Sequence, residues 1–450
     1  MINLRGAPYY FAKSVLGPHE WRTHLREVRL GDIHSLSVQY LQRLLRHASE
    51  RVPYYRSLGL AGRPLSNYPI LGKPDVRRNP SQYQRIGPAD PHWRRLVTSG
   101  STGELLEIVS DRGADAWAET TDMWYFAELL ATSRRAWLSD TKVFIWNRHQ
   151  DPKRKLSVTA RLGRFAAPFT WLEPRAALSE RKLLDYARKI GRLRPTFIMS
   201  YAGVLYEMAR AALGNGLRLH RPRFIVSSGE TLHPFMRQVV EEAFACRVYD
   251  YYGSTEAGLV AGECSAGNLH VFEFSCLAEV LDPTGKPALP GEEGRLILTP
   301  LHNYAMPLIR YDSSDVAQVG PSECPCGCAL PTLKRIAGRT AEFFITREGN
   351  LVAGGRIMKL MRTCSWILGF QALQQDIDRM TVFYKRTDGS TTSQGDVERV
   401  TEGIANLMGA QCEVEWEETE EIPSTPNGKR PYARSLVWED RQPFSLWNPS

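Results

Sequence analysis

Long apolar runs are absent from this 450-residue sequence, and so are internal repeats and low-complexity tracts. Because no stretch of about 18 or more apolar residues occurs, the sequence predicts no membrane-spanning helix. The first residues also lack the basic head, apolar core and small-residue cleavage site of a secretory leader. We therefore expect a cytoplasmic protein with no membrane partner.

Cysteine is scarce, with 8 residues in the whole chain. So few cysteines in so long a chain do not form the disulfide framework of a small secreted domain. Three of them crowd into Cys324-Pro-Cys326-Gly-Cys328, a spacing that suits a metal or a reactive thiol in a reducing compartment. The remaining cysteines stand alone in the sequence, and we expect them to be packing residues: Cys246, Cys276, Cys364 and Cys412.

The excess of positive charge is modest, with 57 Lys and Arg against 49 Asp and Glu and a net charge of +8. The basic residues are spread through the chain. They do not form a basic block interleaved with stacking aromatics, as a nucleic-acid module would. We therefore expect no nucleic-acid partner, although the net charge is compatible with anionic ligands.

The length of the chain favours more than one domain, because one hydrophobic core seldom serves 450 residues. The first 50 or so residues are helical in pattern, and residues 67–87 are rich enough in Pro and Gly to predict a loop. From about residue 141, short apolar strands alternate with helices, which predicts a parallel α/β sheet with helices on its faces. Beyond Tyr252, strands joined by turns predict a β-rich lobe.

A third pattern begins near Gly338, where strands and two helices predict a compact α+β domain of about 110 residues. The predicted fold class is α/β: a large N-terminal domain of parallel α/β sheets with the β-rich lobe, and a small C-terminal α+β domain. We place the boundary between residues 1–338 and 339–450.

The most informative segment is Val97-Thr98-Ser99-Gly100-Ser101-Thr102-Gly103. Glycines permit tight turns and close approach to an anion, and hydroxyls with exposed N–H groups bind phosphate oxygens. The segment is not the GxxxxGK[ST] loop, because no lysine follows its second glycine. On its own, a run of this composition is equally typical of a flexible loop.

The segment resembles the phosphate loop of the adenylate-forming superfamily, which includes acyl-CoA synthetases, luciferases and peptide-synthetase adenylation domains. Further pieces resemble motifs of that superfamily and occur in the same order: Ser228-Gly229-Glu230, Tyr251-Tyr252-Gly253-Ser254-Thr255-Glu256, Arg310-Tyr311-Asp312-Ser313-Ser314-Asp315 followed by Gly338-Arg339, and Pro426-Asn427-Gly428-Lys429. The resemblance covers nearly the whole chain.

Within that superfamily the sequence is most similar to the phenylacetate–CoA ligase-like branch. The segment at 44–58, LLRHASERVPYYRSL, resembles the N-terminal signature of the branch. The segment at 68–80, YPILGKPDVRRNP, resembles the one that follows it. The cysteine-rich stretch after Asp315 also fits this branch better than the long-chain acyl synthetases.

The resemblance implies that the chain binds ATP and Mg²⁺. Thr98, Ser99, Ser101 and Thr102, with Gly100 and Gly103 between them, would bind the β- and γ-phosphates. Glu256 would hold Mg²⁺, a hard cation that prefers oxygen ligands, and Thr255 would contact the α-phosphate. Lys429 would reach the α-phosphate and the carboxylate during adenylation, as a point charge can.

The same resemblance implies how the nucleoside is held. Tyr252 would stack on adenine beside Gly253, and Ser228, Gly229 and Glu230 would line the pocket. Asp315 would accept hydrogen bonds from the ribose hydroxyls, with Arg339 nearby. Each residue has a plainer interpretation: Tyr252 as a core tyrosine, Glu256 as an exposed carboxylate and Lys429 as a solvated turn residue.

The sequence departs from the family pattern at three places. The acid of the family's hinge motif falls at Ala341 or Glu342, depending on alignment. Glu104 and the two leucines after it stand where a proline usually follows the phosphate loop, and Ser313-Ser314 precede Asp315 in an unusual way. None of these removes a group assigned to chemistry, but they favour an altered second half-reaction.

A zinc site is predicted from Cys324-x-Cys326 together with Cys264-x5-His270. Three thiolates and an imidazole form a standard structural zinc site, and members of the branch carry such a set beside the β-rich lobe. Cys328 is a further candidate ligand, and the sequence alone does not distinguish its role from that of Cys324 or Cys326. The alternative is a group of reduced thiols and a histidine without metal.

The predicted function is ATP-dependent activation of an organic acid to acyl-AMP, followed by transfer to coenzyme A as a thioester. The substrate pocket is expected between the two large lobes, near Tyr201, Ser227 and Tyr251, and the abundance of aromatic residues there favours an aryl or arylacetic acid. One alternative keeps the adenylation but transfers the acyl group to an amine or to a carrier protein's phosphopantetheine. Another is a non-catalytic nucleotide-binding relative.

Overall fold

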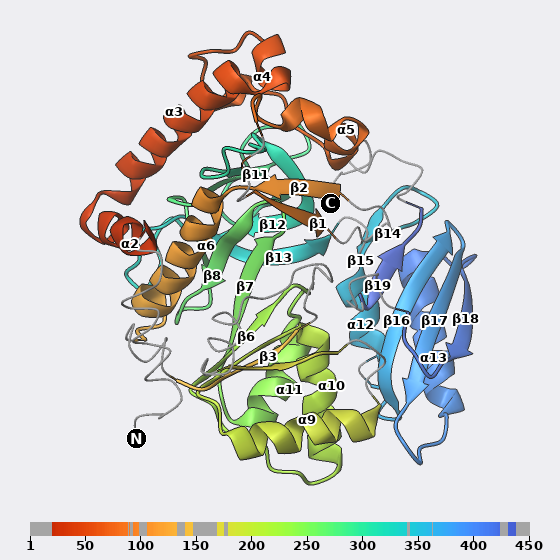
Figure 1. The fold of residues 1–450 in the computed structure, drawn as a ribbon. Coiled ribbons are helices and arrows are strands. Elements are labelled where there is room, and N and C mark those ends of the chain that lie inside the picture. Colours follow the sequence, from red (N-terminus) through yellow and green to blue (C-terminus); the bar gives the residue numbers. More distant parts are fainter. Residues whose placement is uncertain are drawn as a thin grey trace.

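The computed structural model describes most of the chain, namely residues 20–88, 90, 93–98, 106–132, 140–146, 169–174, 179–339, 343–361, 363–423 and 431–437 (Figure 1). The predicted fold class is confirmed: a large mixed sheet carries helices on its faces, and a smaller α+β unit follows it. None of the helices in the described ranges is long and apolar enough to cross a membrane.

Helices form the first described part of the chain, as the sequence predicts: α2 (Glu20–Leu30), α3 (Ile33–Arg51) and α4 (Pro53–Ser57). Helix α3 starts where the Asp32 side chain accepts a hydrogen bond from the Ser35 backbone N–H, a standard N-cap. The loop predicted over residues 67–87 is wrong in part. That segment contains α5 (Lys73–Arg78), whose first turn carries a proline that needs no intrahelical N–H partner, and a short 3₁₀ turn at Pro80–Tyr83.

A central sheet of eleven strands has the order β10-β11-β12-β13-β9-β8-β7-β6-β5-β3-β4. Its parallel half contains β3 (Lys142–Ile145), β4 (Phe169–Leu172), β5 (Phe197–Ser200), β6 (Phe224–Ser228) and β7 (Val248–Ser254). The inner strands β3, β5 and β6 are largely buried, as expected for parallel strands that helices cover on both faces.

Three of the helices that cover the parallel half come from the predicted segments: α9 (Glu180–Leu193), α10 (Ala202–Gly214) and α11 (Pro234–Phe244). The fourth, α6 (Arg112–Trp124), was not predicted. Helix α6 runs on into a π-helical turn, η3 (Tyr125–Leu129). Buried apolar residues recur at helical spacing in α9, for example Leu183, Ala187 and Ile190, so that one stripe faces the sheet.

The β-rich segment is present as predicted, and its strands continue the same sheet through the antiparallel pair β7–β8. These strands are β8 (Gly258–Glu263), β9 (Leu269–Val271), β10 (Cys276–Leu281), β11 (Glu293–Pro300), β12 (Tyr311–Val319) and β13 (Thr332–Arg339). A separate hairpin of β1 (Arg94–Thr98) and β2 (Leu106–Ser110) lies against them (Figure 1).

The C-terminal part combines a hairpin, two helices and a four-stranded sheet of order β18-β17-β16-β19. Its elements are β14 (Phe343–Ile345), β15 (Leu351–Ala353), α12 (Gly354–Met361), β16 (Ile367–Asp376), β17 (Arg379–Arg386), α13 (Gln394–Met408), β18 (Glu413–Glu418) and β19 (Ala433–Ser435). This sheet lies beside α9 and α10 in Figure 1, where Arg210 Nη2 donates to the Ser365 carbonyl at 2.9 Å.

Candidate active site

A pocket opens where β6 and β7 end, at the carboxyl edge of the parallel strands. It is named the carboxyl-edge pocket here and is lined by Gly229, Glu230, Thr231, Asp250, Tyr251, Tyr252, Gly253, Asp315, Ile336 and Gly338. Ligands of open α/β sheets bind outside this edge, because the loops that leave it diverge and create a crevice. The lining residues come from three of the predicted motifs, those that contain Gly229, Tyr252 and Asp315, which are far apart in the sequence.

The contact between Tyr252 and Asp315 defines the middle of the pocket. The Tyr252 hydroxyl donates to the Asp315 carboxylate, although β8, β9 and β13 separate the two residues' strands in the sheet. The sheet must therefore curl so that β12 returns toward β7. Asp315 is buried, so its carboxylate has a fixed position next to the tyrosine ring.

The turn after β6 brings backbone close to two stacked aromatic rings. Gly229 has φ +79°, a conformation that glycine adopts without steric cost. Trp146 and Tyr201 stack with ring centroids 4.1 Å apart, and a Cβ at Gly229 would lie 2.7 Å from Trp146. The next residue, Glu230, accepts a hydrogen bond from the Gly203 N–H at 2.9 Å, at the start of α10. The carboxylate thus caps a helix whose first N–H groups lack intrahelical partners.

Replacing Gly229 with alanine is expected to lower the free energy of unfolding by about 3 kcal/mol, because backbone strain adds to the overlap with Trp146. Gly216→Ala is a matched control. Gly216 has φ +62°, and a Cβ added there would meet no atom within 4 Å, so it tests the strain alone and should cost about 1 kcal/mol. Urea unfolding curves measure both values. Equal losses in the two variants would contradict the predicted contact.

Asp250 is a pocket residue that the sequence analysis missed. It lies two residues before Tyr252 in β7, and alternation along a strand places positions two apart on the same face. Burial raises the pKa of its carboxyl group to about 7, and the negative charge of Glu263 acts in the same direction. Thr231 and Ile336 also line the pocket without belonging to a recognised motif.

Tyr251 points away from Asp250, as neighbours in a strand do. Its hydroxyl donates to Asp122 of α6, and its ring lies 5.1 Å from that of Tyr125. Tyr201 is buried beneath Gly229, and Ser227 is fully buried in β6. The side chains of the three residues expected around the substrate therefore do not form one group, because that of Tyr251 is directed toward the opposite side of the sheet.

Thr255 and Glu256 lie in the turn between β7 and β8. Thr255 is exposed and Glu256 is half-buried, where it accepts a hydrogen bond from the Tyr311 hydroxyl at 3.2 Å. The contact joins two of the predicted motifs, because Tyr311 comes from the segment that contains Asp315. The Glu256 carboxylate remains partly accessible, which a cation ligand requires.

Several predicted residues lie outside the described ranges: Ser99, Gly100, Ser101, Thr102, Gly103, Ala341, Glu342 and Lys429. The residues that flank them are described. Thr98 pairs with Leu106 across the β1–β2 hairpin, and Arg339 pairs with Asp315 across β12 and β13. Tyr432, three residues after Lys429, lies against Gly203, where its hydroxyl would be 3.2 Å from a Cβ.

The predicted metal ligands are gathered in the structure. Cys264, His270, Cys324 and Cys326 each direct one ligand atom to a common point, with all four atoms within 4.8 Å of one another. The Cys264 and Cys324 sulfurs are 3.6 Å apart, and Cys326 Sγ lies 3.2 Å from His270 Nε2. Cys328 is not one of these four residues, although its thiol contacts the His270 side chain.

The chemistry of the cluster fits a divalent metal with soft ligands. His270 Nδ1 lies 3.0 Å from the Leu330 carbonyl, and donation there leaves Nε2 to face the thiols. Burial raises the pKa of the Cys264 thiol, but hydrogen bonds, that with His270 foremost, outweigh it and lower this pKa to about 6. The other cysteines are buried: Cys246, Cys276, Cys364 and Cys412.

Comparison with known proteins gives relatives along nearly the whole chain. Residues 344–434 match the family described as the CapK C-terminal domain. Protein CapK of Staphylococcus aureus is 23% identical and covers 96% of this chain and 95% of its own. Phenylacetate-coenzyme A ligase of Thermus thermophilus is 27% identical and covers 71% of this chain and 73% of its own.

The fold has close neighbours among solved structures. A 2-hydroxyisobutyryl-CoA ligase, in its postadenylation state with an acyl-AMP ligand, superimposes with a TM-score of 0.67 at 17% identity. It covers 91% of this chain and 90% of its own. The fold and the relatives together support the adenylate-forming superfamily, as the five motifs predicted. Within it, they support the phenylacetate–CoA ligase-like branch and the class of AMP-forming carboxylate ligases.

Proposed function

We propose that the protein joins a carboxylic acid to the AMP portion of ATP and then transfers the acyl group to coenzyme A. In the first step a carboxylate oxygen attacks the α-phosphorus and pyrophosphate leaves. In the second step a thiol attacks the acyl carbon and AMP leaves. The observation that carries the proposal is the convergence of Gly229–Glu230, Tyr252 and Asp315 on one pocket.

The carboxyl-edge pocket would hold the nucleoside. The ring of Tyr252 offers a stacking surface for adenine, and the buried Asp315 carboxylate offers the two acceptors that ribose hydroxyls need. Ser228 and Gly253 border the same edge of the sheet. Asp250 would face the base. With a pKa near 7, it would exchange between donor and acceptor forms near neutral pH.

The phosphates would extend from this pocket toward Thr98 and the hydroxyl-rich segment that follows it. Glu256 would hold Mg²⁺, since its carboxylate is partly accessible and is oriented by Tyr311. The cation would neutralise charge on the phosphates. Thr255, Arg339 and Lys429 would contact the phosphates and the ribose from three sides. The proposed role of Lys429 draws support from Tyr432, three residues further along, since Tyr432 and the pocket residue Glu230 both lie against Gly203.

A zinc ion would bind Cys264, His270, Cys324 and Cys326 and tie the loop between β12 and β13 to the end of β8. Four protein ligands leave no open position, so its role would be structural. We further propose that the domain boundary follows Gly338. Strand β13 ends at Arg339, and the CapK C-terminal domain match starts at residue 344.

The acid is proposed to be aromatic or arylacetic. The stacked pair of Trp146 and Tyr201 lies directly beneath Gly229, so an apolar ring could pack close to the nucleotide. This part of the proposal also draws support from the phenylacetate-coenzyme A ligase relative.

A second candidate keeps the adenylation and changes the acceptor to an amine or a carrier-protein thiol. It stands beside the first because the relative that spans nearly the whole chain is protein CapK, whose name specifies no acceptor, whereas the phenylacetate-coenzyme A ligase of Thermus thermophilus covers 71% of the chain. The small domain would complete the site for the second half-reaction, so its relatives bear on the acceptor.

The experiment that tests adenylation is pyrophosphate release from ATP and Mg²⁺ across a panel of aliphatic, aryl and arylacetic acids, with hydroxylamine to trap acyl-AMP. Acid-dependent release is expected, greatest with an aryl or arylacetic acid. Coenzyme A, amines and a phosphopantetheine-loaded carrier are then added in turn, and the acceptor that accelerates AMP release is the natural class. ATP binding without release for any acid would favour the non-catalytic alternative.

A further inference from the structure

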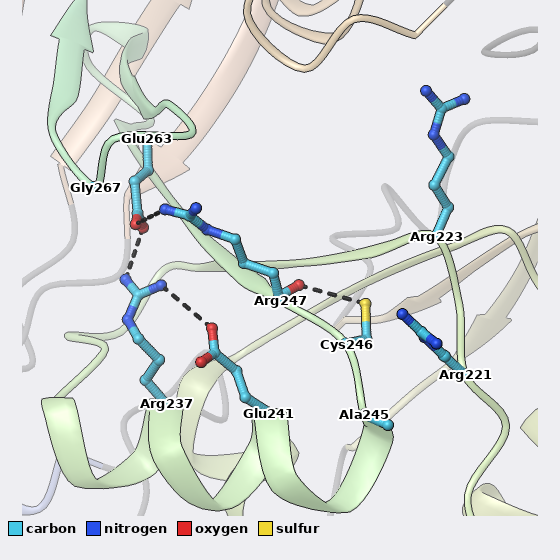
Figure 2. Close-up of a pocket in the computed structure, with 9 residues that line it drawn as sticks. All are labelled: Arg221, Arg223, Arg237, Glu241, Ala245, Cys246, Arg247, Glu263 and Gly267. Atoms are coloured by element: carbon cyan, nitrogen blue, oxygen red, sulfur yellow. Dashed lines mark hydrogen bonds and ion pairs between the residues drawn. The ribbon is translucent and has the colours of Figure 1, made fainter. Parts of the chain in front are cut away.

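A second, larger pocket lies at the opposite edge of the parallel strands. It has a volume of about 770 Å³ and is named the arginine pocket here. Its lining residues are Arg221, Arg223, Arg237, Glu241, Ala245, Cys246, Arg247, Glu263 and Gly267 (Figure 2). Arg223 directly precedes β6 and Arg247 directly precedes β7, so the pocket borders the amino ends of the strands. It is therefore distinct from the carboxyl-edge pocket.

Positive charge dominates the lining. Four arginines face two glutamates, an excess of two positive charges. Burial raises the pKa of the Cys246 thiol to about 11, so the thiol stays neutral and adds no negative charge. Helix α11 ends at Phe244, beside Ala245, and its C-terminus contributes roughly half a negative charge. The arginines outweigh that contribution.

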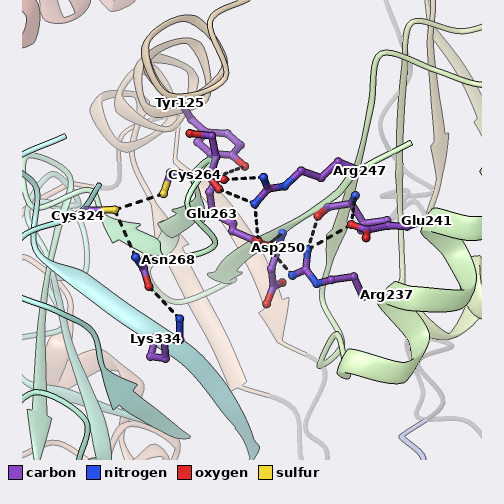
Figure 3. A network of polar contacts seen from close by, with 12 residues as sticks. Tyr125, Arg237, Glu241, Arg247, Asp250, Glu263, Cys264, Asn268, Cys324 and Lys334 are labelled. Carbon is purple, nitrogen blue, oxygen red and sulfur yellow. Dashed lines mark hydrogen bonds and ion pairs between the residues drawn. The ribbon is translucent and has the colours of Figure 1, made fainter. Parts of the chain in front are cut away.

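Ion pairs explain only half of the cluster. Arg237 Nη2 donates to Glu263 at 2.6 Å, and Arg247 Nη2 lies 3.5 Å from the same carboxylate. The Glu263 side chain is 4% exposed, and its buried carboxylate contacts both guanidinium groups (Figure 3). Arg237 also lies 3.9 Å from Glu241, a weak pair. These contacts fix two guanidinium groups as a rigid wall.

The other two arginines, Arg221 and Arg223, are exposed and pair with neither glutamate of the lining. Arg223 Nη2 donates to the Ala131 carbonyl at 3.0 Å, so one end of its guanidinium group has a backbone partner that carries no countercharge. Arg221 extends its guanidinium toward Cys246 in Figure 2. The ion pairs of the two lining glutamates go to Arg237 and Arg247, so the positive charges of Arg221 and Arg223 are not neutralised by a carboxylate of the lining.

We propose that the arginine pocket binds a phosphorylated small molecule, with its phosphate held by Arg221 and Arg223 against the wall formed by Arg237 and Arg247. The planar guanidinium fork matches a phosphate and donates two parallel hydrogen bonds to it. The volume is that of an ordinary small-molecule site, which leaves room for a sugar or nucleoside beyond the phosphate. No step of the adenylation chemistry uses this site.

Equilibrium dialysis of the full chain with radiolabelled inorganic phosphate at low ionic strength tests the proposal. The nucleotide site is filled with a non-hydrolysable ATP analogue and Mg²⁺, and the titration is repeated without them. Wild-type protein is expected to bind phosphate in both conditions. The Arg221→Ala/Arg223→Ala double variant is expected to bind at least about tenfold more weakly. Glucose 6-phosphate should displace the label, and glucose should not.

Arg181→Ala/Arg192→Ala is the matched control, because both residues are exposed on α9 and the variant loses the same net charge. It should bind phosphate like the wild type, and circular dichroism should show both double variants folded. Three results would overturn the proposal: no phosphate bound by the wild type, unchanged binding in the Arg221/Arg223 variant, or equal weakening in the control. If the protein proves not to adenylate an acid, the phosphate titration without the ATP analogue still tests the arginine pocket by itself.

Discussion

The Cys326→Ser variant is expected to lose most of its bound zinc, from about one equivalent per chain in the wild type. Serine is nearly isosteric but is a poor zinc ligand, and Cys326 is only half-buried, so the substitution removes a ligand without opening a core cavity. Elemental analysis of the purified protein measures the loss. The wild type should also lose about 4 kcal/mol of unfolding free energy when a chelator removes the metal, and the variant should not respond.

Cys328→Ser is the control for that experiment. Cys328 lies two residues further along and is also half-buried, but its sulfur is outside the cluster of four ligand atoms. The control should keep a full equivalent of zinc and the chelator response. Metal content that is zero in the wild type, or that falls equally in both variants, would contradict the proposed ligand set.

The Lys429→Ala variant is expected to form acyl-AMP about 10² to 10⁴ times more slowly than the wild type. Removing a cation that faces the charge developing at the α-phosphate costs a few kcal/mol of transition-state stabilisation. Thioester formation from supplied acyl-AMP should change far less, because that half-reaction no longer expels pyrophosphate. Rapid-quench assays of the two half-reactions measure the difference.

Lys359→Ala provides the matched control for Lys429→Ala. Lys359 is an exposed lysine of α12 in the same part of the chain. Its removal should leave both half-reactions at the wild-type rate. If Lys429→Ala adenylated at the wild-type rate, or if both half-reactions fell equally, Lys429 would have another role than the one proposed.

Local patterns predicted the elements of this fold well. The alternation of apolar strands and helices from residue 141 indicated β3, β5 and β6 with helices α9, α10 and α11, because short apolar runs and helical spacing of apolar residues mark them. It did not indicate β4, β7 or α6. The segment at 67–87 was misjudged. Prolines there begin α5 and a 3₁₀ turn instead of preventing helix, since the first helical turn needs no proline N–H.

The site was predictable only where a motif marked it. Tyr252 and Asp315 were named from their motifs, yet their hydrogen bond depends on a curl of the sheet that no local pattern records. Asp250 carries no motif, although its spacing from Tyr252 could have indicated a shared face. The arginine pocket was invisible because Arg221, Arg237 and Arg247 come from separate segments. In the sequence they read as scattered surface charge.

The position of Glu263 has a consequence for how this protein can vary. One carboxylate accepts the Asp250 backbone N–H at 2.8 Å and pairs with Arg237 and Arg247, and the next residue in the chain is Cys264, a proposed metal ligand. Substitutions at these positions share one partner, so their energetic effects should not add. An evolving lineage would have to exchange the group together. A homologue that has replaced Glu263 should therefore show compensating changes at both arginines. The linings of its arginine pocket and its carboxyl-edge pocket should then both differ from those of this protein.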